Sequence, residues 1–235
     1  MIAASTTFRP DQRKAYELAI ERETEQNARW LLEMILENAV IAERKKLPLC
    51  DDTGIPHVVL EIGDTAQIEG NLGEAIKTLD EGITDGLRAL PGRPMGVRGN
   101  DLERIDQSQG LYEDSGMVMA APLRIKAVEG NQLRITVLML GGGPEIRART
   151  YRVFHHHDVS HVSKEIASWA AETAGPLGCT PCVPAVGIGR THYEATCLML
   201  DAMSHKAFGE QNEMERFITD LINQSFIGSL GVGGA

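Results

Sequence analysis

The sequence predicts a mixed α/β (α+β) fold in which N-terminal helices precede a mixed sheet that is flanked by helices. Apolar side chains recur every three or four positions from residue 10 to about residue 46, which is the helical period. Runs of β-type sequence follow at 57–63, 117–128 and 131–140, and helical spacing occurs before and after the last two. This order favours an α+β or mixed α/β arrangement over a regular doubly wound sheet.

The first half of the chain is expected to contain a helical region, a strand, a helix and a long loop. We expect one domain over residues 1–235, with a helical N-terminal region at 1–46. This region should contain two helices with a break near Thr24–Asn27. The elements expected next are a strand at 57–63, a helix at 71–90 and an irregular loop at 91–116. A loop of this length inside a compact domain is often functional, and its arginines favour that interpretation.

The second half is expected to begin with a β-hairpin and to end in helices. The β runs at 117–128 and 131–140 are separated by two residues, and the "EGNQ" stretch at their junction predicts the hairpin. Asp158 is expected to cap a helix that Gly175 ends. The remaining elements expected are a short buried strand at 182–189 and amphipathic helices at 191–209 and 212–226.

Composition and charge argue against several classes of protein. The 235 residues include 33 acidic and 23 basic side chains, a net charge of −10, and no basic block, so we expect no nucleic-acid partner. An anionic ligand would need a locally built site. Apolar runs stay well below about 18 residues, and a secretory leader pattern is missing, so we expect no membrane association and a cytoplasmic protein. Four cysteines are too few for a disulfide scaffold of this size.

One candidate site is the stretch Cys50-Asp51-Asp52-Thr53-Gly54, within "LPLCDDTGIP". A thiolate is a soft ligand for iron or zinc, and adjacent carboxylates can orient a polar substrate or position a proton. The alternative is an Asx-type turn beside an incidental buried cysteine.

A second candidate is "GPLGCTPCVPAVGIGRTH" around Cys179 and Cys182. The spacing allows a redox dithiol, half a zinc site or part of an iron–sulfur ligand set. Its "GIGRT" would place glycine amides at a helix start near Thr191, which suits an anion, although a tight turn alone would also need glycine.

A third candidate is "LGGGPEIRAR", where glycines let a ligand approach the backbone and Arg147 and Arg149 can pair with carboxylates. It fits neither a phosphate-binding loop nor a dinucleotide fingerprint. His155-His156-His157 with His161 could bind a metal, but successive histidines point in different directions, so surface or partner-contact histidines are favoured.

Together these three stretches resemble the iron–sulfur class I fumarate hydratases and L-tartrate dehydratases. "LPLCDDTGIP" is similar to their Pro-x-Cys-Gln/Asp-Asp-Thr-Gly signature, "LGGGPEIRAR" to Lys-Gly-Gly-Gly-Ser-Glu-Asn, and "GCTPCVPAVGIGRT" to Cys-Pro-Pro-Cys…Gly-x-Gly-Gly-Thr. The stretches occur in the family's order and span the chain. The resemblance implies the fold of the N-terminal domain, or alpha subunit, of a hydro-lyase that reversibly dehydrates a 2-hydroxy dicarboxylate of tartrate or malate/fumarate type.

The resemblance also implies a [4Fe-4S] cluster with one open iron that binds the substrate's carboxylate and hydroxyl. Carried over by position, Cys50 and Cys179 would be cluster ligands, and Asp51 and Asp52 would be catalytic and touch the substrate. Gly142 and Gly143 would offer backbone N–H groups to a substrate carboxylate. An arginine would clamp the substrate, and the candidates in order are Arg88, Arg93 and Arg98.

This sequence departs from the family pattern at several positions. Leu140 and Pro144 stand in place of the Lys and Ser beside the triple glycine, Thr180 in place of Pro, and Arg190 in place of Gly. The third cluster cysteine of the family is absent from this sequence, so we expect either that a C-terminal segment is missing or that the chain binds no standard cluster. Cys182 is a further ligand candidate.

The family's catalytic base lies in a second domain, so we expect activity only with a beta subunit and a homodimer of the alpha or alpha–beta unit. The alternative is a non-catalytic paralogue or fragment that acts as a binding or assembly subunit. A simple redox protein built on Cys179 and Cys182 is disfavoured, because Cys182 precedes Val-Pro in a stretch expected to be a buried strand.

Overall fold

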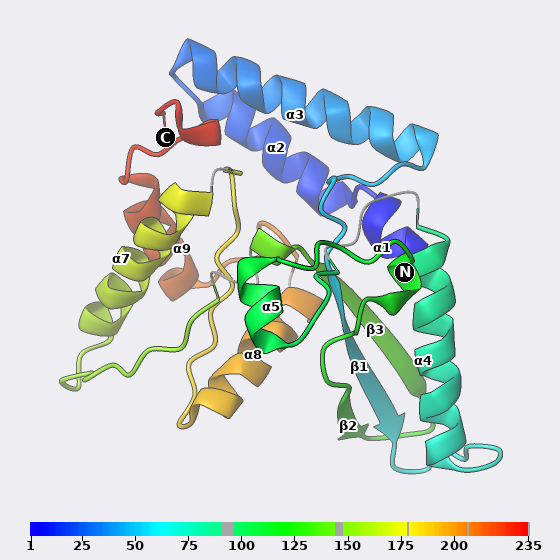
Figure 1. Ribbon diagram of the computed structural model, residues 1–235. Coiled ribbons are helices and arrows are strands. Elements are labelled where there is room, and N and C mark those ends of the chain that lie inside the picture. The colour runs from blue at the N-terminus through cyan, green and yellow to red at the C-terminus, as the bar shows by residue number, and fades with distance from the viewer. Residues whose placement is uncertain (91–95, 144–147, 178, 206, 235) are drawn as a thin grey trace. The chain divides into compact units, whose positions relative to one another are not determined.

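The computed structural model describes residues 1–235 except 91–95, 144–147, 178, 206 and 235. The chain divides into two compact units, each described by itself below. The sheet unit comprises Met1–Thr7 and Ala42–Glu145, and the helical unit comprises Phe8–Ile41 and Ile146–Ala235. Helices and a small mixed sheet make this a mixed α/β fold, as the sequence predicts (Figure 1).

The sheet unit is built on three strands in the order β2-β1-β3. Strand β1 runs parallel to β2 and antiparallel to β3, and Leu60 of β1 lies opposite Ile125 on one side and Ile135 on the other. The bounds of the regular elements in this unit are α1 Ile2–Thr6, β1 Ile55–Gly63, α4 Leu72–Arg88, α5 Asp101–Asp106, the 3₁₀ turn η1 Ser115–Met117, β2 Arg124–Val128 and β3 Leu133–Leu140.

The predicted hairpin between the two β runs is wrong, because β1 lies between β2 and β3. Val58, Val59 and Leu60 are only 3–4% exposed, so this apolar run is buried on both faces and takes the central place in the sheet. The short β2–β3 connection instead crosses the end of β1, where the Gly63 N–H donates to the Gln132 carbonyl at 2.8 Å.

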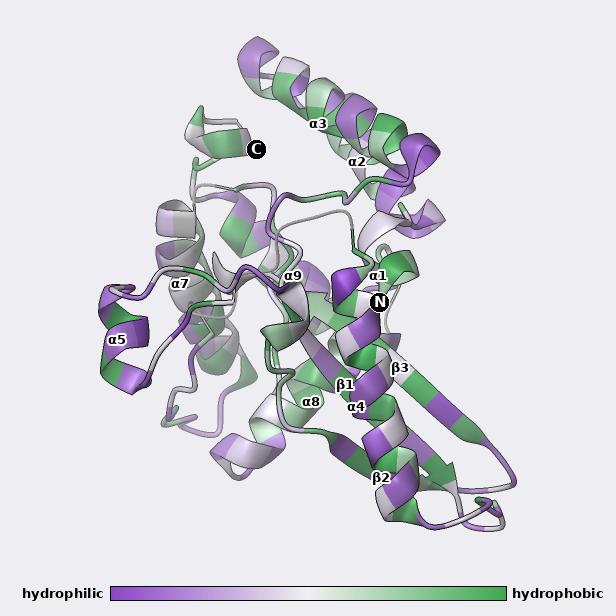
Figure 2. Cartoon of the chain, turned by 45° about the vertical axis from the view of Figure 1, so that its right-hand side comes forward, coloured by the Kyte–Doolittle hydropathy of each residue, from purple (hydrophilic) through white to green (hydrophobic). Residues whose placement is uncertain are grey.

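The core of the sheet unit lies between β1 and α4. The apolar stripe of α4 contributes Ile83 and Leu87, which pack with Val58, Leu90 and Val118. Leu87 is fully buried, and hydrophilic and hydrophobic residues alternate along α4 (Figure 2). Asn71 caps the start of this helix by accepting a hydrogen bond from the Glu74 N–H at 3.0 Å. The helix predicted at 71–90 is therefore confirmed.

In the described part of the loop predicted at 91–116, residues 101–106 form the short helix α5. Asn100 caps α5 and accepts from the Leu102 and Glu103 N–H groups, while the Glu103 carboxylate accepts from the Asn100 N–H at 2.9 Å. This is a capping box, and it accounts for a helix of only one to two turns in otherwise irregular chain.

The helical unit is built from helices and extended segments. Its regular elements are α2 Pro10–Arg22, α3 Gln26–Lys45, α7 Val159–Leu177, α8 His192–His205, α9 Glu213–Asn223 and the 3₁₀ turn η2 Ser229–Gly231, with α3 from residue 42 onward counted in the sheet unit. Helix α7 packs along α9 (Figure 1). The break predicted near Thr24–Asn27 is confirmed by the gap between α2 and α3.

Two expectations for the helical unit are corrected. Gly175 lies inside α7, without the positive φ that a helix-ending glycine needs, and the helix continues to Leu177. The predicted cap Asp158 is confirmed, since its Oδ1 accepts from the Ser160 N–H at 2.8 Å. The stretch 182–189 is not a buried strand: Val183 is 64% exposed, and Pro184 in this stretch lacks the N–H that strand pairing would need.

Among the described residues, none of the helices has the length and apolarity required to cross a membrane.

Candidate functional site

The turn at residues 50–54, here called the Cys50 turn, has an exposed start and a buried end. Cys50 and Asp51 are exposed, whereas Thr53 is only 4% exposed. Gly54 has φ +86°, and a Cβ at this position would lie 2.5 Å from the Leu140 carbonyl carbon and oxygen. Only glycine combines this backbone conformation with such close contact. The Cys50 turn is therefore fixed against the residue that precedes the triple glycine.

Asp52 joins the Cys50 turn to the triple glycine itself. Its Oδ2 accepts a hydrogen bond from the Gly142 N–H at 2.7 Å, between residues 90 positions apart. Carboxylate acceptors form short and strong bonds of this kind. Two stretches that the sequence analysis identified separately thus meet in one place, and Gly143 lies half-buried beside Gly142.

Two oxygen atoms at this junction are buried without a hydrogen-bond partner among the described residues. They are Asp52 Oδ1 and Thr53 Oγ1. A buried polar atom left unpaired costs about 1–3 kcal/mol, so such atoms in folded proteins are typically satisfied by a ligand or an ordered water. The junction of Asp52, Thr53 and Gly142 is accordingly the best candidate binding site within the sheet unit.

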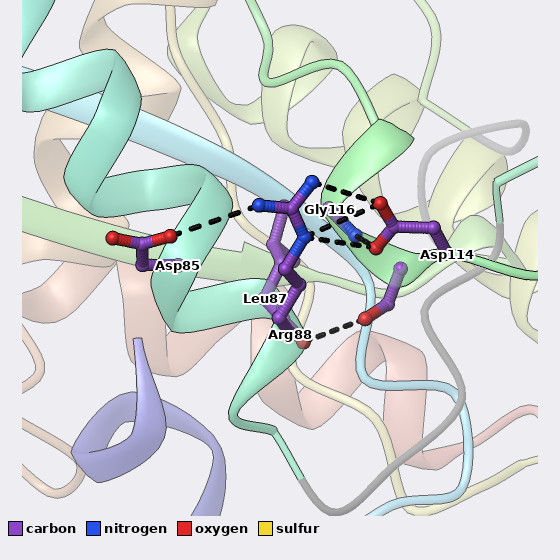
Figure 3. Close-up of polar contacts among 6 residues, drawn as sticks. Asp85, Leu87, Arg88, Asp114 and Gly116 are labelled. Atoms are coloured by element: carbon purple, nitrogen blue, oxygen red, sulfur yellow. Dashed lines mark hydrogen bonds and ion pairs between the residues drawn. The ribbon is translucent and has the colours of Figure 1, made fainter.

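Arg88, the first candidate for a substrate clamp, is already paired in the structure (Figure 3). Its guanidinium donates to Asp114 through Nε at 3.1 Å and through Nη2 at 2.8 Å, and Asp85 lies 3.8 Å from Nη1. The hydrogen bonds from Arg88 hold the pKa of Asp114 below its usual range, and the same pair raises the pKa of Arg88. Sequence reasoning missed Asp114.

The contact between Arg88 and Asp114 ties the C-terminal end of α4 to η1. Asp114 also accepts from the Gly116 N–H at 2.9 Å, and Ser115 Oγ donates to the Leu87 carbonyl at 2.9 Å. A Cβ at residue 116 would lie 2.7 Å from Arg88 Nε, so the glycine permits the close approach. The signal that could have found Asp114 is its position before Ser-Gly, a common start for a capped turn.

The structure gives less information about the other arginines that were predicted to bind a carboxylate. Arg93 lies outside the described residues. Arg98 is exposed, and its backbone N–H donates to the Gly110 carbonyl at 2.9 Å. Arg147 also lies outside the described part of the chain, while Arg149 Nη1 donates to the Tyr151 hydroxyl at 3.4 Å.

The Cys179 loop lies in the helical unit. Cys179 and Cys182 are free thiols on exposed residues, and Thr180 between them is buried. Thr180 Oγ1 donates to the Gly228 carbonyl at 2.5 Å, and the Leu230 N–H donates to the Thr180 carbonyl at 3.0 Å. Desolvation raises the pKa of the Cys182 thiol, which disfavours the thiolate form that metal binding requires.

Comparison with known proteins settles the family. The family model for fumarate hydratase (Fumerase) matches residues 1–235. The chain belongs to the fumarate hydratase family. This confirms the resemblance of its three stretches, and the hydro-lyases of this family include both fumarate hydratases and tartrate dehydratases.

Two relatives illustrate the breadth of the fumarate hydratase family. The chain is 28% identical over 232 residues to a Methanocaldococcus jannaschii protein named "Putative L(+)-tartrate dehydratase subunit alpha", covering 95% of this chain and 78% of that protein. It is 26% identical over 240 residues to "Fumarate hydratase 2" of Leishmania major, covering 94% of this chain and 40% of that protein. The chain therefore spans well under half of the longer relative.

The residues of this fumarate hydratase family member fit an iron–sulfur cluster in part. Cys50 in the sheet unit and Cys179 in the helical unit are free and exposed, so both soft donors are accessible. Across the part of the chain that the structure describes, no group of three or more His, Cys, Asp or Glu residues is arranged to hold a metal ion. Two accessible thiols are thus present, and the described residues do not identify a third ligand.

Two other sequence candidates have local roles. Thr191 Oγ1 accepts from the Glu194 N–H at 3.1 Å and caps α8, and the Glu194 carboxylate pairs with Arg190. The histidines form two edge-to-face ring pairs, His155 with His157 and His156 with His161, each with ring centres 4.9 Å apart. Neighbouring histidines therefore do point in different directions.

Proposed function

We propose that this chain is the alpha subunit of an iron–sulfur-dependent hydro-lyase that reversibly removes water from a 2-hydroxy dicarboxylate of tartrate or malate type. The hydrogen bond between Asp52 and the Gly142 N–H is the single observation that carries the proposal. It brings the cysteine-bearing turn and the triple glycine into one site, with two buried oxygens that still need partners.

Cys50 and Cys179 would hold a [4Fe-4S] cluster with one open iron. When bound, the cluster supplies a Lewis acid that stabilises the departing hydroxyl group. A third thiolate must complete the ligand set. Cys182 is the weaker candidate, because the raised pKa of its thiol opposes thiolate formation. The described cysteines form no disulfide, which is in keeping with a reducing cytoplasm.

The carboxylates beside Cys50 would bind and orient the substrate. Asp51 is exposed and can accept a hydrogen bond from a substrate hydroxyl. Asp52 uses one oxygen to hold Gly142 and has its second oxygen available for a donor at the same site. Contacts from both Asp51 and Asp52 would hold the substrate in one orientation, which lowers the entropic cost of reaching the transition state.

A substrate carboxylate would be bound by backbone N–H groups at Gly142 and Gly143 and by an arginine. Because the Gly142 N–H donates to Asp52, the substrate would share or displace that bond. Arg88 would similarly have to leave Asp114 to act as the clamp. In both exchanges a substrate carboxylate would replace an aspartate carboxylate, so each donor would keep a negatively charged acceptor.

The partner would be a beta subunit that supplies the base for the carbon-bound proton, with a homodimer of the alpha or alpha–beta unit as the assembly. The name of the Methanocaldococcus jannaschii relative, a "subunit alpha", supports a two-subunit enzyme.

Anaerobic reconstitution of the full chain with ferrous iron and sulfide tests this proposal. We expect a brown protein with stoichiometric iron and sulfide in the wild type and a large loss of both in Cys50→Ser. Cys197→Ser is the matched control, because Cys197 lies half-buried in α8, and it should retain the cluster. Equal iron contents in the Cys50→Ser variant and the wild type would refute the role of Cys50.

A second candidate function is a non-catalytic binding or assembly subunit of the same fold. The engagement of Arg88 by Asp114 favours it, since the guanidinium is already paired inside the chain. In this case the chain would bind the beta subunit without taking up iron. Dehydration of L-tartrate or L-malate by the reconstituted pair of subunits would exclude it.

A further inference from the structure

We propose that Thr180 is a positioning residue that sets the place of the Cys179 thiol by tying it to the glycine-rich turn at 228–233. The inference rests on the proposed role of Cys179 as a cluster ligand. It assigns a function to the C-terminal turn, which the sequence analysis left without one.

Thr180 is joined to the C-terminal turn by both its side chain and its backbone. Its hydroxyl donates to the Gly228 carbonyl at 2.5 Å, and its own carbonyl accepts from the Leu230 N–H at 3.0 Å. Thr180 is only 6% exposed, whereas the adjacent Cys179 is exposed. The buried residue therefore anchors the loop, and the neighbouring thiol remains accessible to a ligand.

The C-terminal turn is stiff enough to serve as an anchor. The Gly233 N–H donates to the Ile227 carbonyl at 3.1 Å, and the Val232 N–H donates to the Ser229 carbonyl at 3.2 Å. Gly228 has φ +64°, and a Cβ there would lie 1.7 Å from the Gly233 carbonyl oxygen. These short contacts close the turn on itself and leave little room for rearrangement.

The far end of the same turn lies against Glu23, at the break between α2 and α3 of the helical unit. A Cβ at residue 234 would lie 2.6 Å from a carboxylate oxygen of Glu23, so the backbone there packs directly on that side chain. Glu23 is only 4% exposed and accepts from the Glu25 N–H at 2.8 Å. The anchor of Cys179 thus continues to the break between α2 and α3.

The anchored loop restricts the positions of the Cys179 thiol before a metal binds. Less conformational entropy is then lost on binding, which favours metal affinity. The side-chain bond from Thr180 is the part of the anchor that substitution can remove without changing the backbone. Thr180→Val keeps the branched shape and deletes the hydroxyl, and Thr180→Ser keeps the hydroxyl.

The first measurement is hydrogen exchange of the Leu230 amide, which donates to the Thr180 carbonyl, in the metal-free full chain, followed by peptide mass spectrometry. Amides of the sheet unit are the internal reference. One net hydrogen bond corresponds to a roughly fivefold change in a local opening equilibrium. We therefore expect roughly fivefold faster exchange at Leu230 in Thr180→Val, with wild-type rates in Thr180→Ser and in the sheet unit.

The second measurement is iron retention after anaerobic reconstitution, which should fall in Thr180→Val and remain at the wild-type level in Thr180→Ser. An unchanged Leu230 exchange rate in a folded Thr180→Val variant would overturn the inference. A wild-type chain that takes up no iron would instead overturn the proposed function, and the exchange rates would still decide whether Thr180 anchors the loop. Matching circular dichroism melting curves establish that the variants are folded.

Discussion

Gly54→Ala is the sharpest test of how the Cys50 turn is held. A side chain at position 54 would meet the Leu140 carbonyl carbon and oxygen at 2.5 Å and the Gly141 nitrogen at 2.8 Å. All three are backbone atoms, so they cannot rotate away as the end of a flexible side chain could. The chain must shift at the Cys50 turn, at the triple glycine or at both.

The magnitude has two parts. An L-residue in a left-handed conformation costs about 1–2 kcal/mol, which applies because Gly54 has φ +86°. Forcing extra atoms into a packed site costs about another 1–3 kcal/mol. The free energy of unfolding should therefore fall by about 2–5 kcal/mol, and iron binding at Cys50 should weaken with it.

Gly130→Ala is the matched control. Gly130 is also in the sheet unit and has φ +92°, but a Cβ there has no heavy atom within 4 Å. It should lose only the conformational part, about 1–2 kcal/mol. Urea unfolding monitored by circular dichroism compares the two variants. If Gly54→Ala is no more destabilising than Gly130→Ala, the close packing of the Cys50 turn on residues 140–141 is refuted.

Three further variants test other contacts. Leu87→Ala empties the centre of the sheet-unit core and should lower the free energy of unfolding by about 2–5 kcal/mol in urea, and a loss below about 1 kcal/mol would contradict its full burial. The hydrogen bond from Arg9 lowers the pKa of Asp11 to about 2, so Asp11→Asn should lose about 1 kcal/mol near pH 6. Because that stabilisation is lost as the pH falls through about 2, variant and wild type should converge there in a pH series of urea unfolding curves. Asp114→Ala removes the cap of η1, so hydrogen exchange at the Gly116 amide should accelerate, and an unchanged rate would contradict the cap.

The sequence by itself determined most of the helices and the identity of the chemical groups. The apolar period of 71–90 was enough to predict α4, because helix formation depends on neighbours three and four positions away. The thiol and carboxylates of the Cys50 turn and the triple glycine were also recognisable, since each is a local pattern.

Tertiary structure alone decided which segments pair. The local pattern of the two β runs on either side of residues 129–130 is compatible with a hairpin as well as with the observed strand order β2-β1-β3. The burial of β1 on both faces decides between them, because it places β1 in the centre of the sheet. The contacts of Asp52 with Gly142 and of Arg88 with Asp114 join residues 90 and 26 positions apart. No periodicity within a segment specifies such bonds, because they form only when packing of the whole unit brings donor and acceptor together.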